Sequence, residues 1–249
     1  MKKVFIILTV LFCAIMLSFS LYYQKTQKVL LVAELTGFKI ENFETEEPKT
    51  DNANTIKTSL KQLGIVTYIN AETNQFAALG HSLIDSPKGT DINGECYNVK
   101  FEGTYANLEE SKNLGNIYLN EEEPIGTIYY DSYTGIYGKI NNLQEEKYKE
   151  IETENRYHIK TGKANILIRL DGINLESYEV EILAINYIAK NKNIRIKITD
   201  KRLIEATGGI VQGMSGTPVI QNGKLIGAIN CVSIDSPQDA YAIFIDKLL

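Results

Sequence analysis

Residues 213–230 read GMSGTPVIQNGKLIGAIN, a stretch that predicts a β-hairpin preceded by a glycine-framed turn. Two apolar runs, 217–220 and 224–230, flank a turn centred on Asn222-Gly223. Asn-Gly favours a two-residue hairpin loop, because both residues tolerate positive φ angles. The stretch therefore predicts two antiparallel strands, with a serine exposed on the turn in front of them.

Short strands bounded by turn residues are predicted through most of the chain from residue 64 onward. The segments 178–185 and 193–199 alternate apolar with charged residues, which is typical of strands with one exposed face. Further strands are predicted at residues 29–33, 65–69, 75–79, 125–130, 135–140, 164–170 and 240–245, with one helical turn at 201–206. Many short strands at close spacing predict a mainly β fold, built as a barrel or a sandwich.

The composition limits the class of protein. The 249 residues are 44% hydrophobic and 23% charged, which is ordinary for a globular protein of one large or two small domains. The net charge of -5 provides no basic stripe, so we expect no nucleic-acid partner. The sequence has no Cys-x-x-Cys motif and no His/Cys cluster, so we expect no metal site. Cys96 and Cys231 are either a disulfide pair or two small buried thiols.

The N-terminal region has the pattern of a membrane anchor. Two lysines precede residues 4–23, which are apolar apart from a few hydroxyl groups and long enough to span a bilayer. The segment ends in bulky aromatic residues rather than a small-residue cleavage site, so we expect a retained transmembrane helix, with the rest of the chain outside the cytoplasm. The expected divisions are an anchor at 1–23, a stalk or linker with a short strand at 24–60, and one β domain at 61–249.

Ser215 is the candidate nucleophile. Gly213 and Gly216 on either side of it let the backbone turn sharply and approach a substrate closely. In such a turn the amides of Gly213 and Ser215 are candidates for an oxyanion hole. A serine needs an adjacent base, and the chain contains two histidines. His81 ends an apolar strand, which favours the edge of a cleft, whereas His158 lies among charged residues and favours exposed surface.

Several aspartates compete to orient the base. A serine nucleophile with a histidine base also needs an acceptor that fixes the imidazole. Asp200 follows the alternating strand at 193–199 and precedes the serine turn. Its competitors are Asp85, Asp131 and Asp171, of which Asp171 is best explained as a turn residue because a glycine follows it.

Three blocks of the sequence resemble one known family. Residues 200–228 resemble the signature of the SpoIVB-type serine peptidases, which are signalling peptidases of endospore-forming bacteria. Residues 64–85, which contain Ala-Leu-Gly-His81, resemble the histidine segment of that family, and residues 160–167 resemble a further block. The resemblance runs from about residue 64 to the end of the printed sequence.

The resemblance implies a fold and a set of site residues. It implies a trypsin-like double β-barrel, and a triad of His81 as general base, Asp200 as orienting carboxylate and Ser215 as nucleophile. The amides of Gly213 and Ser215 would hold the oxyanion, and no metal or organic cofactor is implied. One departure is that members typically carry a PDZ domain between the anchor and the peptidase, and residues 24–63 are too few for that domain.

The resemblance also implies a role and a partner. A member of this family is a membrane-anchored endopeptidase that acts in the space between the forespore and mother-cell membranes. Its protein substrate would be a membrane-bound regulator of a complex that processes a sigma-factor precursor, and it would also cleave itself. Two alternatives are a catalytically silent module that binds peptides on the same fold, and a general secreted protease.

Overall fold

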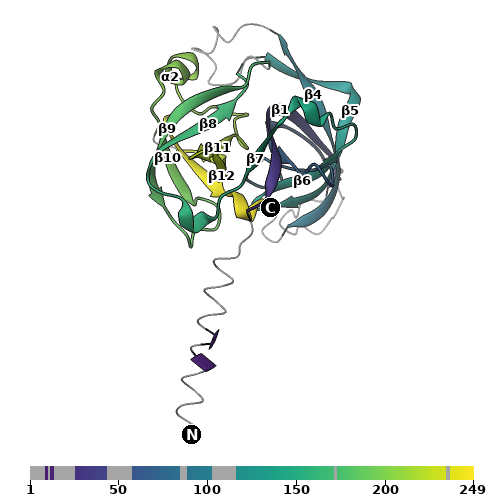
Figure 1. Ribbon diagram of the computed structural model, residues 1–249. Helices are drawn as coiled ribbons and strands as arrows, with labels where there is room; N and C mark the ends of the chain where they lie inside the picture. Colours follow the sequence, from purple (N-terminus) through teal and green to yellow (C-terminus); the bar gives the residue numbers. More distant parts are fainter. Residues whose placement is uncertain are drawn as a thin grey trace, which may run out of the picture.

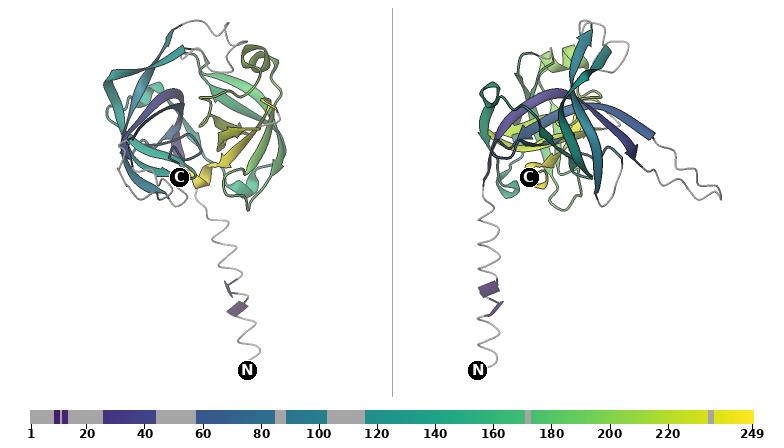
Figure 2. Two further views of the ribbon diagram at one scale, coloured as in Figure 1. Left: turned by 180° about the vertical axis from the view of Figure 1, so that it is seen from behind. Right: turned by 90° about the vertical axis from the view of Figure 1, so that its right-hand side faces the viewer.

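A computed structural model describes most of the chain in two barrels that lie side by side (Figure 1). The described residues are 9–10, 12–13, 26–43, 58–84, 89–102, 116–170, 173–233 and 236–249. The reverse view shows the same two barrels side by side, and in the side view they overlap (Figure 2). The mainly β, double-barrel architecture expected from the sequence is therefore confirmed.

The first barrel is formed by the N-terminal half of the described chain. Its strands are β1 (Lys28–Phe43), β2 (Thr58–Ile69), β3 (Gln75–Ala78), β4 (Thr90–Glu102), β5 (Asn116–Ser132) and β6 (Gly135–Ile140). They run in the order β2-β3-β6-β5-β4-β1, and antiparallel pairing of β1 with β2 closes the ring. The short strand β7 (Lys149–Glu152) adds to the outside of β1 and leads the chain to the second barrel.

The second barrel closes in the order β10-β13-β12-β11-β8-β9. Its strands are β8 (Gly162–Ile168), β9 (Glu176–Ile185), β10 (Ile194–Ile198), β11 (Pro218–Gln221), β12 (Lys224–Val232) and β13 (Asp239–Phe244). The described helices are short: α2 (Lys201–Thr207), η2 (Glu145–Lys147), η3 (Arg156–His158) and η4 (Ile245–Lys247). The predicted Asn-Gly hairpin is the pair β11–β12, with Asn222 and Gly223 at φ angles of 53° and 78°.

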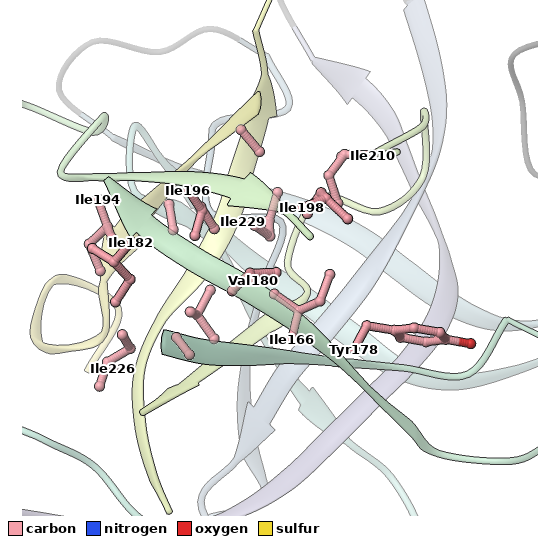
Figure 3. Close-up of a cluster of buried hydrophobic side chains, with 14 of the residues drawn as sticks. Ile166, Tyr178, Val180, Ile182, Ile194, Ile196, Ile198, Ile210, Ile226 and Ile229 are labelled. Carbon is pink, nitrogen blue, oxygen red and sulfur yellow. The ribbon is translucent and has the colours of Figure 1, made fainter. Parts of the chain in front are cut away.

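The interior of the second barrel follows from the alternation seen in its sequence. On β10 the isoleucines at 194, 196 and 198 are buried and the intervening arginine and lysine are exposed. β9 alternates in the same way, and its inward side chains meet those of β10 in one apolar cluster (Figure 3). β-Branched side chains suit this pleated, half-buried setting, so the hydrophobic pattern fixes which face of each strand points inward.

Another apolar cluster joins the two barrels. Leu31 and Tyr68 of the first barrel pack against Leu225, Ile243 and Leu248 of the second. The Tyr68 hydroxyl donates a buried hydrogen bond of 2.7 Å to the carbonyl oxygen of Leu248. This polar contact gives the buried phenol a partner inside an otherwise apolar junction.

One region differs from the sequence-based prediction, and another falls mostly outside the described residues. Residues 28–43, placed by the sequence in a linker with one short strand, form the long strand β1 of the first barrel. Of the predicted anchor at 1–23, only residues 9–10 and 12–13 are described. Within the described ranges the structure contains no helix that is both long and apolar enough to cross a membrane.

Candidate active site

Ser215 lies on the turn that enters β11, where its backbone is fixed to the first barrel. Gly213 and Gly216 flank it at φ angles of 96° and 95°, which L-residues with a side chain rarely adopt. A Cβ on Gly216 would lie 2.0 Å from the carbonyl oxygen of Ile65 on β2. The amide of Ile65 donates a 2.7 Å hydrogen bond to the carbonyl oxygen of Ser215. Glycine is therefore required here by close contact between the barrels, as well as by backbone conformation.

The amides around Ser215 fall into two groups. The Met214 amide donates to Val211 O at 3.1 Å, and the Gly216 amide donates to Ile229 O at 2.7 Å. The amides of Gly213 and Ser215 donate to no other residue in the described part of the chain. Two amides on one turn that donate to no described residue are candidates for an oxyanion hole.

His81 follows β3 on a sharp turn beside the serine. Leu79 and Gly80 both have positive φ angles, of 70° and 68°, which turns the chain away from the strand. A Cβ on Gly80 would lie 3.1 Å from both the Asn230 Cβ and the Ile229 carbonyl oxygen. Ser215 Oγ donates a 3.4 Å hydrogen bond to the carbonyl oxygen of the same Asn230. The structure thus brings the histidine and serine segments together on either side of Asn230.

The His81 imidazole contacts its own loop rather than the serine. Its Nδ1 lies 2.9 Å from the carbonyl oxygen of Ser82. A carbonyl only accepts hydrogen bonds, so Nδ1 carries the hydrogen and Nε2 holds the lone pair of the neutral ring. Among the described residues no hydrogen bond joins His81 to Ser215, and each side chain contacts a different backbone carbonyl group.

The second histidine has the surface position that the sequence predicted. His158 belongs to η3, and 62% of its side chain is exposed. Its Nδ1 pairs with the carboxylate of Glu154 at 3.2 Å. Hydrogen bonding to His158 helps to lower the pKa of the Glu154 carboxyl, although partial burial acts in the opposite direction as the largest influence. These contacts describe a hydrogen bond on the surface rather than a catalytic base.

Asp200 lies at the start of α2, where it caps the helix. Its Oδ1 accepts hydrogen bonds from the amide and Nε of Arg202 at 3.0 and 3.1 Å. Its Oδ2 accepts from Arg202 Nη2 at 2.8 Å and from the Glu179 amide on β9 at 3.2 Å. The hydrogen bond from the Arg202 side chain is the main reason that the pKa of this carboxyl lies below its ordinary value. All these partners belong to the second barrel, and Figure 1 shows α2 at its periphery.

Asp131 lies at the end of β5 and faces the loop that carries the histidine. It is fully buried, with an exposed fraction of 0%. Its carboxylate accepts hydrogen bonds from Ser82 Oγ at 2.5 Å, from the Leu83 amide at 2.8 Å and from the Ile84 amide at 3.2 Å. The other two competing aspartates, at positions 85 and 171, lie outside the described residues.

The remaining candidate ligands do not gather into a site. Cys96 on β4 and Cys231 on β12 are both free thiols, and burial raises the pKa of Cys96 to about 12. In the described ranges, no three His, Cys, Asp or Glu side chains come close enough together to hold a metal ion.

Comparisons with known proteins identify one family and several structural neighbours. The family model described as SpoIVB peptidase S55 matches residues 54–249. The active form of the Rv3671c protease from M. tuberculosis is 13% identical, with a TM-score of 0.43, and the alignment covers 87% of this chain and 78% of that one. The HtrA-type protease AlgW with a tripeptide is also 13% identical at a TM-score of 0.43, with 88% of this chain aligned to 58% of AlgW.

Proposed function

This chain belongs to the SpoIVB peptidase S55 family, and from this premise we propose that it is a serine endopeptidase whose nucleophile is Ser215. One observation carries the proposal. Asn230 accepts the Ser215 hydroxyl through its carbonyl oxygen, and a Cβ added at Gly80, the residue before His81, would lie 3.1 Å from the Asn230 Cβ, so the loop that carries the base packs closely on the strand that holds the nucleophile. This close packing of the two segments at the junction of the barrels supports His81 as the base for Ser215.

The proposed reaction needs only groups of this chain and water. Ser215 Oγ turns from Asn230 O towards the imidazole, forms a bond to the peptide carbonyl carbon, and gives its proton to His81 Nε2. The carbonyl oxygen becomes an anion that accepts hydrogen bonds from the amides of Gly213 and Ser215. The imidazolium then donates its proton to the leaving amine, and water releases the acyl group from the serine by the same route.

The physiological role is proposed from family membership and from the apolar N-terminal sequence. Membership of the family supports a part in signalling during endospore formation, with a membrane-bound regulatory protein as substrate and self-cleavage as a second reaction. The apolar sequence at 4–23 supports anchoring in the membrane, with the peptidase outside the cytoplasm, between the forespore and mother-cell membranes. No cofactor is needed for the proposed chemistry.

A second candidate function is a silent module that binds peptides. The observation in its favour is that the Ser215 hydroxyl donates to Asn230 O and not to His81. A hydroxyl without a base is a poor nucleophile, so a protein fixed in this arrangement would hold a peptide without cleaving it. In many enzymes the hydrogen bonds between catalytic groups form fully only when substrate binds. A substrate-free structure in which Ser215 and His81 are not bonded is therefore also expected of a peptidase.

A fluorophosphonate probe distinguishes the two candidates, because it reacts with activated serines only. The full chain, with Ser215→Ala and Ser177→Ala variants, is treated with the probe and incubated with co-expressed membrane proteins. We expect labelling and cleavage by the wild type and by Ser177→Ala, whose change lies on an exposed part of β9, and neither by Ser215→Ala. Neither activity in the wild type would favour the binding module, and equal cleavage by Ser215→Ala would exclude the serine mechanism.

A further inference from the structure

The Asp200 carboxylate has no capacity left for the histidine. A carboxylate offers about four lone-pair sites. Arg202 donates three hydrogen bonds to Asp200 and the Glu179 amide donates a fourth. The Arg202 guanidinium is itself held by the Ser177 carbonyl oxygen, at 2.7 Å, and lies over the Tyr178 ring. Asp200 is thus part of a polar cluster that ties α2 to β9.

The Asp131 carboxylate is fully buried and binds the loop that follows the candidate base. Burying a charge is costly unless donors compensate, and no lysine or arginine of the described chain forms an ion pair with Asp131. Among the described residues, its hydrogen-bond donors are Ser82, Leu83 and Ile84, the three residues that directly follow the candidate base. The carboxylate is therefore devoted to one loop, and the residue next to that loop is His81.

A continuous chain of contacts runs from Asp131 to the imidazole. Ser82 donates its hydroxyl to Asp131, and its carbonyl oxygen lies 2.9 Å from His81 Nδ1. Holding Ser82 by its side chain restricts the direction of its carbonyl group. That carbonyl in turn selects the tautomer in which Nε2 is free to accept a proton. A carboxylate that acts through another residue in this way positions the base without touching the substrate.

We propose that Asp131, rather than Asp200, is the positioning carboxylate of the site, and that it acts on His81 through Ser82. The inference rests on the proposed peptidase function, because it assigns a residue for the same reaction. It departs from the triad that family resemblance implies, in which Asp200 has this role. In its place Asp200 stabilises the second barrel.

Two pairs of variants test the proposal on a fluorogenic peptide selected from a library with the wild-type protein. Asp131→Asn is expected to lower kcat by about 10²–10⁴-fold with KM changed less than about threefold, because only the positioning of the base is lost. Asp200→Asn is expected to lower kcat by less than about threefold, while it lowers the midpoint of thermal unfolding. A loss of kcat in Asp200→Asn as large as that in Asp131→Asn would overturn the proposal.

Variants at Ser82 decide the outcome if Asp131→Asn does not fold, as judged by circular dichroism. Ser82→Ala removes the hydroxyl and is expected to lower kcat by about tenfold or more, whereas Ser82→Thr retains a hydroxyl and restores most of it. Equal kcat in both Ser82 variants and in wild type would refute the link to His81. Ser215→Ala is assayed alongside to separate the two proposals. Peptide hydrolysis by Ser215→Ala would refute the serine mechanism. Hydrolysis that is lost in Ser215→Ala but unchanged in Asp131→Asn would refute only the role proposed for Asp131.

Discussion

The hydroxyl of Thr67 on β2 donates a buried hydrogen bond of 2.7 Å to the carbonyl oxygen of Gly216, the residue that follows the nucleophile. Two residues earlier on the same strand, the Ile65 amide donates to the carbonyl oxygen of Ser215. The first barrel therefore holds the backbone of the serine turn at two successive carbonyl groups. The position of the nucleophile depends on the packing of both barrels, although the turn itself belongs to the second.

Gly216→Ala is expected to disrupt this contact between β2 and the serine turn. The added Cβ would lie 2.0 Å from Ile65 O and 2.8 Å from the Leu79 amide nitrogen, both backbone atoms that cannot move aside cheaply. Together with the positive φ angle, this predicts a loss of unfolding free energy above about 2 kcal/mol, and a fall in kcat beyond that expected from stability alone. Urea unfolding and peptide hydrolysis measure the two effects.

Gly223→Ala is the matched control for Gly216→Ala. Its φ angle of 78° is also positive, but a Cβ there would meet nothing within 4 Å. We expect a cost of about 1 kcal/mol from backbone strain, with kcat close to that of the wild type. Similar losses in the two variants would mean that contact between the barrels does not set the position of Ser215.

The two histidines are expected to differ sharply in their effect on activity. His81→Gln removes the base beside Ser215 and is expected to lower kcat by about 10³-fold or more. His158→Gln removes one side of a surface contact with Glu154 and is expected to change kcat by less than about twofold. Steady-state kinetics on the same peptide compare them, and a large loss in His158→Gln would mean that the base has been assigned to the wrong residue.

Asp200 is expected to contribute to stability in a pH-dependent way. The hydrogen bond from Arg202 lowers its pKa in the folded state, so its stabilising effect is present above the unfolded-state value of about 3.9 and is lost as the pH falls through the lower folded-state value. Asp200→Asn is expected to cost about 0.5–1 kcal/mol at pH 7, since the Arg202 side chain is 61% exposed. Urea unfolding of both proteins from pH 7 downward should show the difference shrink below about pH 4, and a difference that grows would contradict the assigned pairing.

Arg156 is expected to make a larger contribution than an exposed ion pair. Its Nε and Nη2 donate to both carboxylate oxygens of Asp246 at 2.5 and 2.8 Å, and its guanidinium lies 5.1 Å from the centre of the Phe244 ring. Arg156→Lys loses the two-pronged geometry and is expected to lower the free energy of unfolding by about 2 kcal/mol. The control is Lys28→Ala, whose pair with Glu150 is 63% and 58% exposed, so its removal is expected to change the free energy of unfolding less than Arg156→Lys does.

The sequence pattern predicted the elements whose chemistry is local. The hairpin at 217–230 follows from the Asn-Gly turn, and the alternation at 178–185 and 193–199 identified β9 and β10. β4 and β5 were missed in large part, because residues 90–102 and 116–124 contain many polar and acidic residues. These segments are strands because β4 and β5 pair with each other and β4 also pairs with β1, and such pairing cannot be read from composition.

The position of Asp131 could not be predicted from the sequence pattern. Asp131 lies in Tyr-Asp-Ser-Tyr-Thr-Gly, which reads as an ordinary turn. Its partners lie 47–49 residues earlier in the chain, and only closure of the first barrel brings them within hydrogen-bonding distance. Asp200 is nearer to the serine in sequence, yet its position after β10 commits it to capping α2. Distance along the chain was therefore a poor guide to distance in the site.

The end of the described chain lies at the seam between the barrels, as both front and rear views show (Figures 1 and 2). The carbonyl oxygens of Lys247 and Leu248 accept from Tyr137 and Tyr68 of the first barrel, and Lys247 Nζ donates to carbonyl oxygens at positions 189 and 190 of the second. A ribosome adds these two residues after the strands of both described barrels. A nascent chain that lacks them cannot form these hydrogen bonds between the barrels, so proteolysis is expected to begin only after residue 248 has been translated.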